Sequence, residues 1–156
     1  MIDSEGFRAN VGIILTNNDR QVFWARRTGM DAWQFPQGGI KKNESPKAAM
    51  YRELKEEIGL EPDHIEILNS TNDWLRYLLP KQYIRNNSEP LCIGQKQKWY
   101  LLKLVVDDRY LDLSSTSDPE FDLWKWVDFW QPIDEIISFK REVYQQALKQ
   151  LEPFIV

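Results

Sequence analysis

The chain has 156 residues, of which 42% are apolar and 28% charged, a size and balance that suit one folded domain and exclude a disordered chain. The formal net charge of −4 excludes a protein that coats nucleic acid over its whole surface. A local basic site remains possible, because residues 76–103 carry six lysines and arginines against one glutamate.

The first strands are expected near the N-terminus. Residues 10–16 (NVGIILT) have the pattern of a buried strand, and residues 21–27 (QVFWARR) alternate as a second strand after the turn NNDR. Together they predict a hairpin. Residues 32–39 (AWQFPQGG) form a short extended segment that ends in a double glycine.

A helix is expected over residues 45–59. Ser45 has the side chain of an N-cap, Pro46 suits the first helical position, and Gly59 closes the helix. Tyr51, Leu54 and Ile58 are expected to point toward the core.

The second half of the chain predicts further strands and closing helices. Strands are expected at 64–70, 73–79, 96–106 and 121–129, with a loop at 84–94. A short helix is expected at 132–137, and an amphipathic helix at 138–154, where apolar residues recur every four positions: Phe139, Val143, Ala147 and Leu151. This order predicts an α/β fold with a mixed sheet covered by helices.

The single cysteine and the single histidine limit the chemistry. Cys92 alone permits no internal disulfide and no cysteine-rich metal site. His64 lies at the expected start of a strand, and we interpret it as a structural residue. A bound metal would therefore be held by oxygen atoms, which favours Mg²⁺ or Mn²⁺ over Zn²⁺.

The N-terminus shows no targeting signal. MIDSEGFRAN lacks a basic region followed by an apolar run, and no stretch approaches the roughly 18 apolar residues of a membrane-spanning helix. We expect a cytoplasmic protein.

Three carboxylates crowd one side of the helix over 45–59. Glu53, Glu56 and Glu57 fall within an arc of about 100°, which we expect to be separate from the buried face. One interpretation is an ordinary solvated face supported by Lys55 and Arg52. The other is a divalent cation site, because a cation would turn the mutual repulsion into attraction.

The surrounding residues favour the second interpretation. Residues 38–60 follow the pattern G-x5-E-x7-R-E-U-x-E-E-x-G-U, where U is aliphatic, and so resemble the Nudix box. All nine fixed positions match: Gly38, Glu44, Arg52, Glu53, Leu54, Glu56, Glu57, Gly59 and Leu60. Segments along nearly the whole chain, such as WQFPQGGI, IGQKQKWYLL and PEFDLWKWV, are similar to the bacterial RNA pyrophosphohydrolases, which share a branch with the diadenosine polyphosphate hydrolases.

The resemblance implies a fold and a metal site. The fold would be the Nudix α/β/α sandwich, with residues 1–156 forming a single domain. The catalytic and metal-binding carboxylates would be Glu53, Glu56, Glu57 and Glu120, with Gly38 contributing its carbonyl to Mg²⁺ or Mn²⁺. Glu120 could otherwise be an ordinary turn residue. Glu44 and Arg52 would pair and brace the loop. We assign the general base to Glu56 first and to Glu120 second.

The resemblance also implies substrate contacts. Arginine forks onto phosphate oxygens, and an aromatic ring can stack on a base. The expected contacts are Arg8, Arg27, Gln95, Lys98, Phe139 and Lys140. For Phe139 the alternative of core packing remains open, since it continues the apolar spacing of the last helix.

The implied function is hydrolysis of 5′-triphosphate or diphosphate RNA ends to monophosphate, which would initiate mRNA decay. The first alternative is a diadenosine polyphosphate hydrolase. Two others are a housecleaning enzyme on free nucleotides and a non-catalytic binding module, although such modules commonly lose the box carboxylates. RNA is the expected partner, with no DNA or membrane. A monomer is the simpler expectation, and a protein activator remains open.

Overall fold

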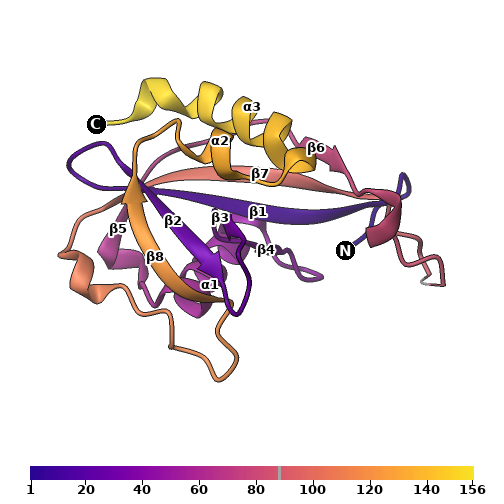
Figure 1. The fold of residues 1–156 in the computed structure, drawn as a ribbon, viewed down its shortest axis with the longest axis horizontal. Helices are drawn as coiled ribbons and strands as arrows, with labels where there is room; N and C mark the ends of the chain where they lie inside the picture. The colour runs from indigo at the N-terminus through magenta and orange to yellow at the C-terminus, as the bar shows by residue number, and fades with distance from the viewer. Residues whose placement is uncertain (88) are drawn as a thin grey trace.

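The computed structural model describes residues 1–87 and 89–156, and its centre is a mixed sheet (Figure 1). Strands β1 (Phe7–Thr16) and β7 (Gly94–Leu104) run parallel at its middle, paired from Phe7 and Gly94 to Thr16 and Lys103. The other strands are β2 (Val22–Arg27), β3 (Trp33–Gln34), β4 (Gln37–Gly39), β5 (Ile65–Ser70), β6 (Leu75–Leu78) and β8 (Phe121–Val127).

The edge of β1 opposite β7 is shared by two strands. Near its start β1 pairs with β4, where Val11 lies opposite Gly38, and at its end it pairs with β2, where Thr16 lies opposite Val22. Strand β8 extends the sheet beyond β2. The sheet therefore divides along this edge, and β4 and β8 lie in different branches.

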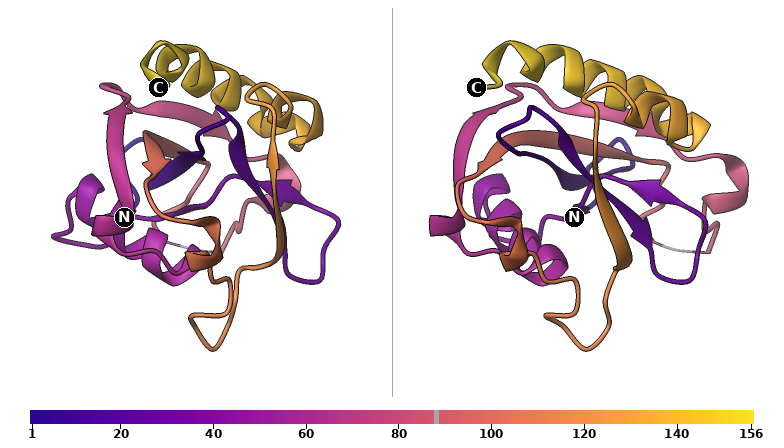
Figure 2. Two further views of the ribbon diagram at one scale, coloured as in Figure 1. Left: turned by 90° about the vertical axis from the view of Figure 1, so that its left-hand side faces the viewer. Right: turned by 60° about the vertical axis from the view of Figure 1, so that its left-hand side comes forward.

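Helices cover both faces of the sheet (Figure 2). Helix α1 (Pro46–Ile58) lies on one face, and α2 (Pro132–Glu135) and α3 (Arg141–Leu151) lie on the other. Five single-turn 3₁₀ helices complete the described structure: η1 (Pro62–His64), η2 (Lys81–Tyr83), η3 (Asp108–Tyr110), η4 (Ser138–Lys140) and η5 (Glu152–Phe154). The α/β/α sandwich expected from the sequence is confirmed.

Alternation along β1 separates two cores, because successive side chains of a strand face opposite sides. Ile14 packs toward α3 in a core that includes Trp24, Phe35, Trp99 and Tyr144. The core under α1 contains apolar residues of β1 and α1, among them Val11, Ile13, Leu54 and Ile58. The expected buried face of α1 is confirmed.

The ends of α1 follow their predicted chemistry. The Ser45 hydroxyl accepts a hydrogen bond from the Ala48 backbone N–H at 3.1 Å, and Pro46 occupies the first helical position. Gly59 ends the helix with φ at 73°, the left-handed conformation that glycine adopts readily. His64 is structural as predicted: its Nδ1 accepts a hydrogen bond from the Glu61 N–H at 2.9 Å.

The closing helix is shorter than predicted. The span 138–154 divides into η4, α3 and η5, so Phe139 lies in the turn before α3 rather than on it. Pro153 lacks an N–H donor, which disfavours continuation of the α-helix. Within residues 1–87 and 89–156, every helix is too short or too polar to cross a membrane.

Candidate active site

Glu53 is buried against the glycine that begins the box. Gly38 lies in β4, and a Cβ built on it would stand only 2.0 Å from Cδ of Glu53. Glu53 retains just 6% of its exposure. The expectation that the acidic face of α1 is separate from its buried face is therefore wrong at Glu53, because the missing side chain at Gly38 leaves room for a carboxylate beneath β4.

Arg52 connects the box residues. Its Nε and Nη2 donate to the two carboxylate oxygens of Glu44 at 2.8 and 2.9 Å, and Nη2 also donates to the Gly39 carbonyl at 2.8 Å. Its Nη1 donates to Glu53 at 2.7 Å and lies 3.4 Å from Glu56 Oε2. The Arg52 hydrogen bond, before any other cause, lowers the pKa of Glu44 to about 2. The predicted brace between Glu44 and Arg52 is present.

The pKa of Glu57 is raised well above its ordinary value. Burial is the largest cause, followed by the charges of Glu53 and Glu120, and together they raise the pKa of Glu57 to about 8. Burial also raises the pKa of Glu53, despite the opposing effect of Arg52. The Glu57 Oε2 atom is buried without a hydrogen-bond partner among the described residues.

Glu120 reaches this group from another branch of the sheet. It immediately precedes β8, and its Oε1 lies 3.4 Å from Nε of Arg27 at the end of β2. Its charge contributes to the raised pKa of Glu57, so it stands within electrostatic reach of α1. Glu120 and Glu57 therefore interact electrostatically although they come from distant parts of the sequence.

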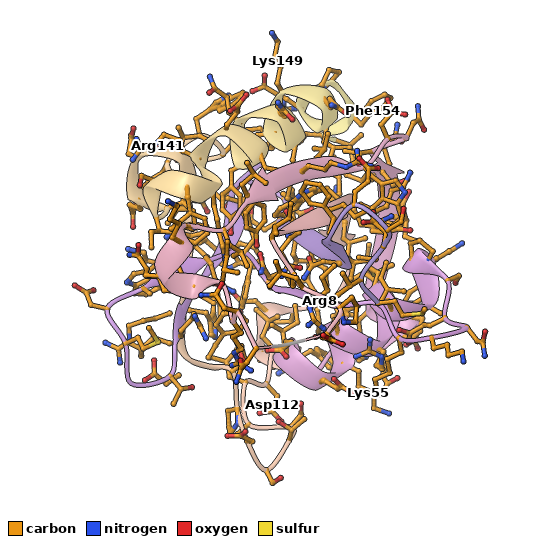
Figure 3. All side chains as sticks on the ribbon, turned by 90° about the vertical axis from the view of Figure 1, so that its right-hand side faces the viewer. Arg8, Lys55, Asp112, Arg141, Lys149 and Phe154 are labelled. Atoms are coloured by element: carbon orange, nitrogen blue, oxygen red, sulfur yellow. The ribbon has the colours of Figure 1, made fainter. Side chains whose placement is uncertain are left out.

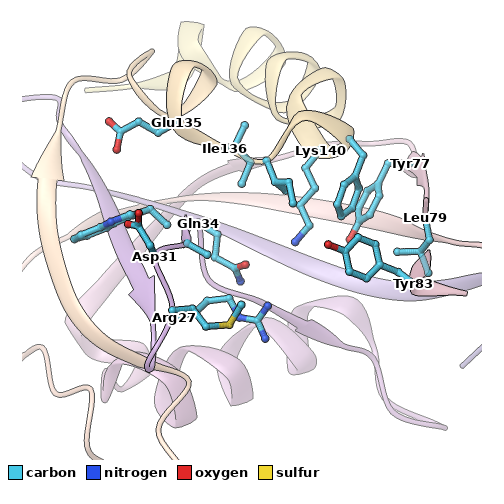
Figure 4. A pocket seen from close by; sticks show the side chains of 14 residues that line it. Arg27, Asp31, Gln34, Tyr77, Leu79, Tyr83, Glu135, Ile136 and Lys140 are labelled. Atoms are coloured by element: carbon cyan, nitrogen blue, oxygen red, sulfur yellow. The ribbon is translucent and has the colours of Figure 1, made fainter. Parts of the chain in front are cut away.

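A cavity of about 510 Å³ opens beside Arg27 (Figure 4). Phe139 forms part of its wall, with its ring centroid 5.8 Å from that of Tyr77 and 5.7 Å from that of Tyr83. The ammonium group of Lys140 points into the space, and burial, more than the nearby Arg27, lowers the pKa of Lys140 to about 8. Aromatic surface and positive charge therefore line one space.

A second cavity, of about 370 Å³, contains two other expected contacts. Arg8 and Gln95 line it, and Tyr83 lines both cavities. Gln95 Oε1 is buried without a hydrogen-bond partner in the part of the chain that the structure describes. In Figure 3, Arg8 lies between the α3 layer, marked by Arg141, and the α1 layer, marked by Lys55.

Lys98 lines neither of these cavities. Its Nζ donates to the Asn72 carbonyl and lies 5.2 Å from the centroid of the Trp74 ring. The six expected substrate contacts are therefore distributed over three places.

Comparison with known proteins identifies the family. A NUDIX domain model matches residues 6–147. The chain belongs to the Nudix family.

Its curated Nudix relatives match over nearly their whole length. The chain is 57% identical to the RNA pyrophosphohydrolase of Thioalkalivibrio sulfidiphilus over 155 residues, which cover 99% of this chain and 90% of that protein. It is 59% identical to the RNA pyrophosphohydrolase of Pseudomonas putida strain GB-1 over 153 residues, which cover 98% and 96%.

Solved structures of other proteins show the same fold at lower identity. The E. coli dihydroneopterin triphosphate pyrophosphohydrolase superposes with a TM-score of 0.71 at 18% identity, covering 92% of this chain and 98% of that one. The binary complex of the C. elegans Ap4A hydrolase gives 0.63 at 19% identity, covering 94% and 99%. At such identities the likeness concerns the fold alone.

Nudix hydrolases generally use divalent metal ions. Two features of this chain suit one: the cradle for Glu53 at Gly38 and the unpartnered oxygen of Glu57. Among the described residues, no three acidic, histidine or cysteine side chains already converge on one point. Arg52 holds Glu53 and Glu56, so an ion would compete with its guanidinium.

Two aromatic residues that line the cavities, Tyr77 and Tyr83, were not predicted as functional from the sequence. Tyr77 alternates with Leu75 on the buried side of β6, so its pattern resembled ordinary core packing. Tyr83 lies in η2, between the predicted strand 73–79 and the predicted loop 84–94, where no periodicity marks it. The composition, with seven Trp, seven Phe and six Tyr, was a signal for such aromatic surfaces.

Proposed function

We propose that this chain is an RNA 5′-pyrophosphohydrolase. It would convert triphosphate or diphosphate RNA ends to monophosphate with Mg²⁺, or with Mn²⁺ in its place. The observation that carries the proposal is the 57–59% identity, over nearly the full chain, to proteins named RNA pyrophosphohydrolase. The complete Nudix box supports hydrolysis rather than mere binding.

The metal would be held by Glu53, Glu56, Glu57 and Glu120, with the Gly38 carbonyl nearby. A bound divalent ion supplies charge neutralisation for the polyphosphate and lowers the pKa of water. The support is the acidic group around α1, where burial and like charge raise the pKa of Glu57 and so favour binding of a positive ion.

Glu56 is our first assignment for the general base and Glu120 the second. Water attacks a phosphorus of the 5′ polyphosphate, the bond to the leaving pyrophosphate or phosphate breaks, and the proton of the water passes to the base. Glu56 is the solvent-exposed member of the α1 group, with 45% of its side chain accessible. That exposure supports its contact with an incoming water.

The two cavities would receive the RNA. Arg27 lies beside both Glu120 and the larger cavity, which suits a contact with phosphate. Phe139 would stack on a base, and Lys140 would add positive charge beside it. Arg8 and Gln95 would contact the substrate from the second cavity, and Lys98 from the surface near Trp74.

The cellular role follows from the product. A monophosphate end would expose a transcript to endonucleases that prefer such ends, so the enzyme would initiate mRNA decay in the cytoplasm. We propose that the single domain acts as a monomer on RNA, without DNA or membrane as a partner.

A competition assay tests the proposal. RNA with a labelled 5′-triphosphate and diadenosine tetraphosphate are offered together with Mg²⁺, and both products are followed. Preferential formation of monophosphate RNA is expected, with kcat falling by about 10² to 10⁴ in Glu56→Gln. The control is Glu61→Gln, which alters an exposed ion pair with Lys55. Fast cleavage of the dinucleotide with intact RNA ends would instead assign a diadenosine polyphosphate hydrolase.

A further inference from the structure

Glu120 stands outside the helix that carries the other carboxylates. The residues just before it, 114–118, are exposed. Its Oε1 lies 3.4 Å from Nε of Arg27, and each of these two side chains is about two-fifths exposed. The Ser115 hydroxyl ties the segment before Glu120 to α1 by donating to the Lys55 carbonyl at 2.9 Å. A further contact is needed to fix Glu120 relative to β2.

The turn after β2 provides that contact. The Thr28 N–H donates to the Glu120 carbonyl at 2.9 Å, and the Thr28 hydroxyl donates to the Pro119 carbonyl at 2.8 Å. Both bonds involve backbone carbonyls of the segment that carries Glu120. The turn that begins at Thr28 therefore positions this segment directly.

Asp122 in β8 also holds this segment to the end of β2. Its Oδ1 accepts from Arg26 Nε at 2.9 Å, and its Oδ2 accepts from Arg26 Nη2 and from the Gly29 N–H, both at 3.1 Å. Two donors belong to Arg26 in β2 and the third to Gly29 in the turn that follows. A carboxylate held by a forked arginine has a defined orientation as well as a favourable energy.

The strand register explains why this carboxylate is needed. Arg26 pairs with Leu123 and Arg27 with Phe121, which leaves Asp122 as an extra residue in β8. Such a bulge interrupts the ladder and redirects nearby side chains. At this point the Arg26–Asp122 ion pair, rather than regular strand pairing, sets the relation between β2 and the residues before β8.

The position of the segment 119–122 also affects the proposed substrate cavity, through Arg27. Arg27 lines the larger cavity and pairs with Glu120, so the end of β2 supplies part of the cavity wall and a partner for the Glu120 carboxylate. A displacement of 119–122 against the turn would move Glu120 away from both Arg27 and α1.

We propose that Arg26 and Asp122 are positioning residues that hold Glu120 in the metal site through their bidentate ion pair. The inference rests on the proposed function, in which Glu120 contributes to metal binding. Each side chain is about one-third exposed, at 35% and 32%. Exposed ion pairs contribute little to global stability, so the effect should be local.

The test is Mn²⁺ titration of the metal-free 156-residue chain by calorimetry, with thermal unfolding recorded on the same samples. Asp122→Asn and Arg26→Gln should each weaken Mn²⁺ affinity about 10-fold, the scale found for residues that orient metal ligands. Arg26→Lys keeps the charge but lacks the fork, and should resemble Arg26→Gln. The double variant should lose no more than either single one.

Two reference variants separate the possible failures. Glu120→Gln should weaken Mn²⁺ binding; unchanged affinity there would overturn the role of Glu120 in the proposed site. Glu61→Gln removes a charge from an exposed ion pair elsewhere and should bind Mn²⁺ as wild type. If Glu120→Gln weakens binding but Asp122→Asn does not, the positioning role alone is overturned. It is also overturned if the melting temperature of Asp122→Asn falls far below that of Glu61→Gln.

Discussion

The carboxylate of Glu53 occupies the space where a side chain on Gly38 would begin. A Cβ at Gly38 would lie 2.0 Å from Cδ and 2.2 Å from Oε1 of Glu53, far inside any non-bonded contact. Gly38→Ala should therefore displace Glu53 and lower kcat about 10- to 100-fold. The measurement is hydrolysis of triphosphate RNA alongside Mn²⁺ affinity.

The adjacent glycine provides a matched control. A Cβ at Gly39 meets no atom within 4 Å among the described residues, and the backbone carbonyl that accepts from Arg52 is retained in alanine. Gly39→Ala should keep near-normal kcat. Equal losses in the two variants would mean that backbone flexibility, not room for Glu53, explains the effect.

Glu57 predicts how stability depends on pH without metal. Its pKa rises from 4.5 to about 8 on folding, mainly through burial, so between these values the folded protein holds a proton that the unfolded chain has released. The contribution of Glu57 to the free energy of unfolding in EDTA should therefore be fully present below about pH 4.5. It should decrease as the pH rises toward 8. Urea unfolding at several pH values measures the slope.

The same proton must leave when a metal binds below pH 8. Calorimetric titration of Mn²⁺ in two buffers of different ionisation enthalpy should reveal proton release near neutral pH. In Glu57→Gln both the release and the stability slope should shrink. A stability that rises from pH 5.5 to 8 in EDTA because of Glu57 would contradict the assigned direction.

Phe139 tests the larger cavity. Stacking on a base is worth about 1–3 kcal/mol, so Phe139→Ala should raise KM for triphosphate RNA about 10-fold while kcat changes little. Phe154→Ala, at an exposed position near the C-terminus, is the control and should leave KM unchanged. A variant with normal KM and only reduced stability would favour the alternative in which Phe139 serves the core.

Tyr144 provides a prediction about stability alone. It is fully buried, and its hydroxyl accepts a hydrogen bond from the Phe35 N–H at 3.2 Å. Tyr144→Phe would leave that N–H buried without a partner, at a cost of about 1–3 kcal/mol in the free energy of unfolding. The exposed Tyr110→Phe is the control. Denaturant titration that finds the two variants equally stable would contradict this role.

Local patterns in the sequence were sufficient for most of the fold. The caps Ser45 and Gly59 act through neighbours a few residues away, and the continuous apolar run of β1 reflects burial of both its faces, so both could be predicted from nearby residues. The division of 32–39 into β3 and β4 could not. It depends on which strand lies beside each piece, since β3 pairs with β2 and β4 with β1.

The candidate site shows the same limit. Arg52, Glu53, Glu56 and Glu57 occupy fixed positions on one helix, so their grouping was predictable, and the box pattern also predicted the pairing of Glu44 with Arg52. The burial of Glu53 was not, because it arises from a distant strand that carries no side chain at Gly38. The ion pair of Arg26 and Asp122 joins residues far apart in sequence across a bulge, which no local pattern indicates.

The parallel pairing of β1 with β7 has a consequence for the order in which the growing chain acquires structure. Phe7 can pair with Gly94 only after β7 has been synthesised, and β8 is synthesised later still. Pairings between distant segments slow folding because a long loop must close first. Helix α1 leaves the ribosome early with its three glutamates, but Glu120 arrives only with the last strand. A nascent chain would thus remain unable to complete its carboxylate group until Glu120 has been translated.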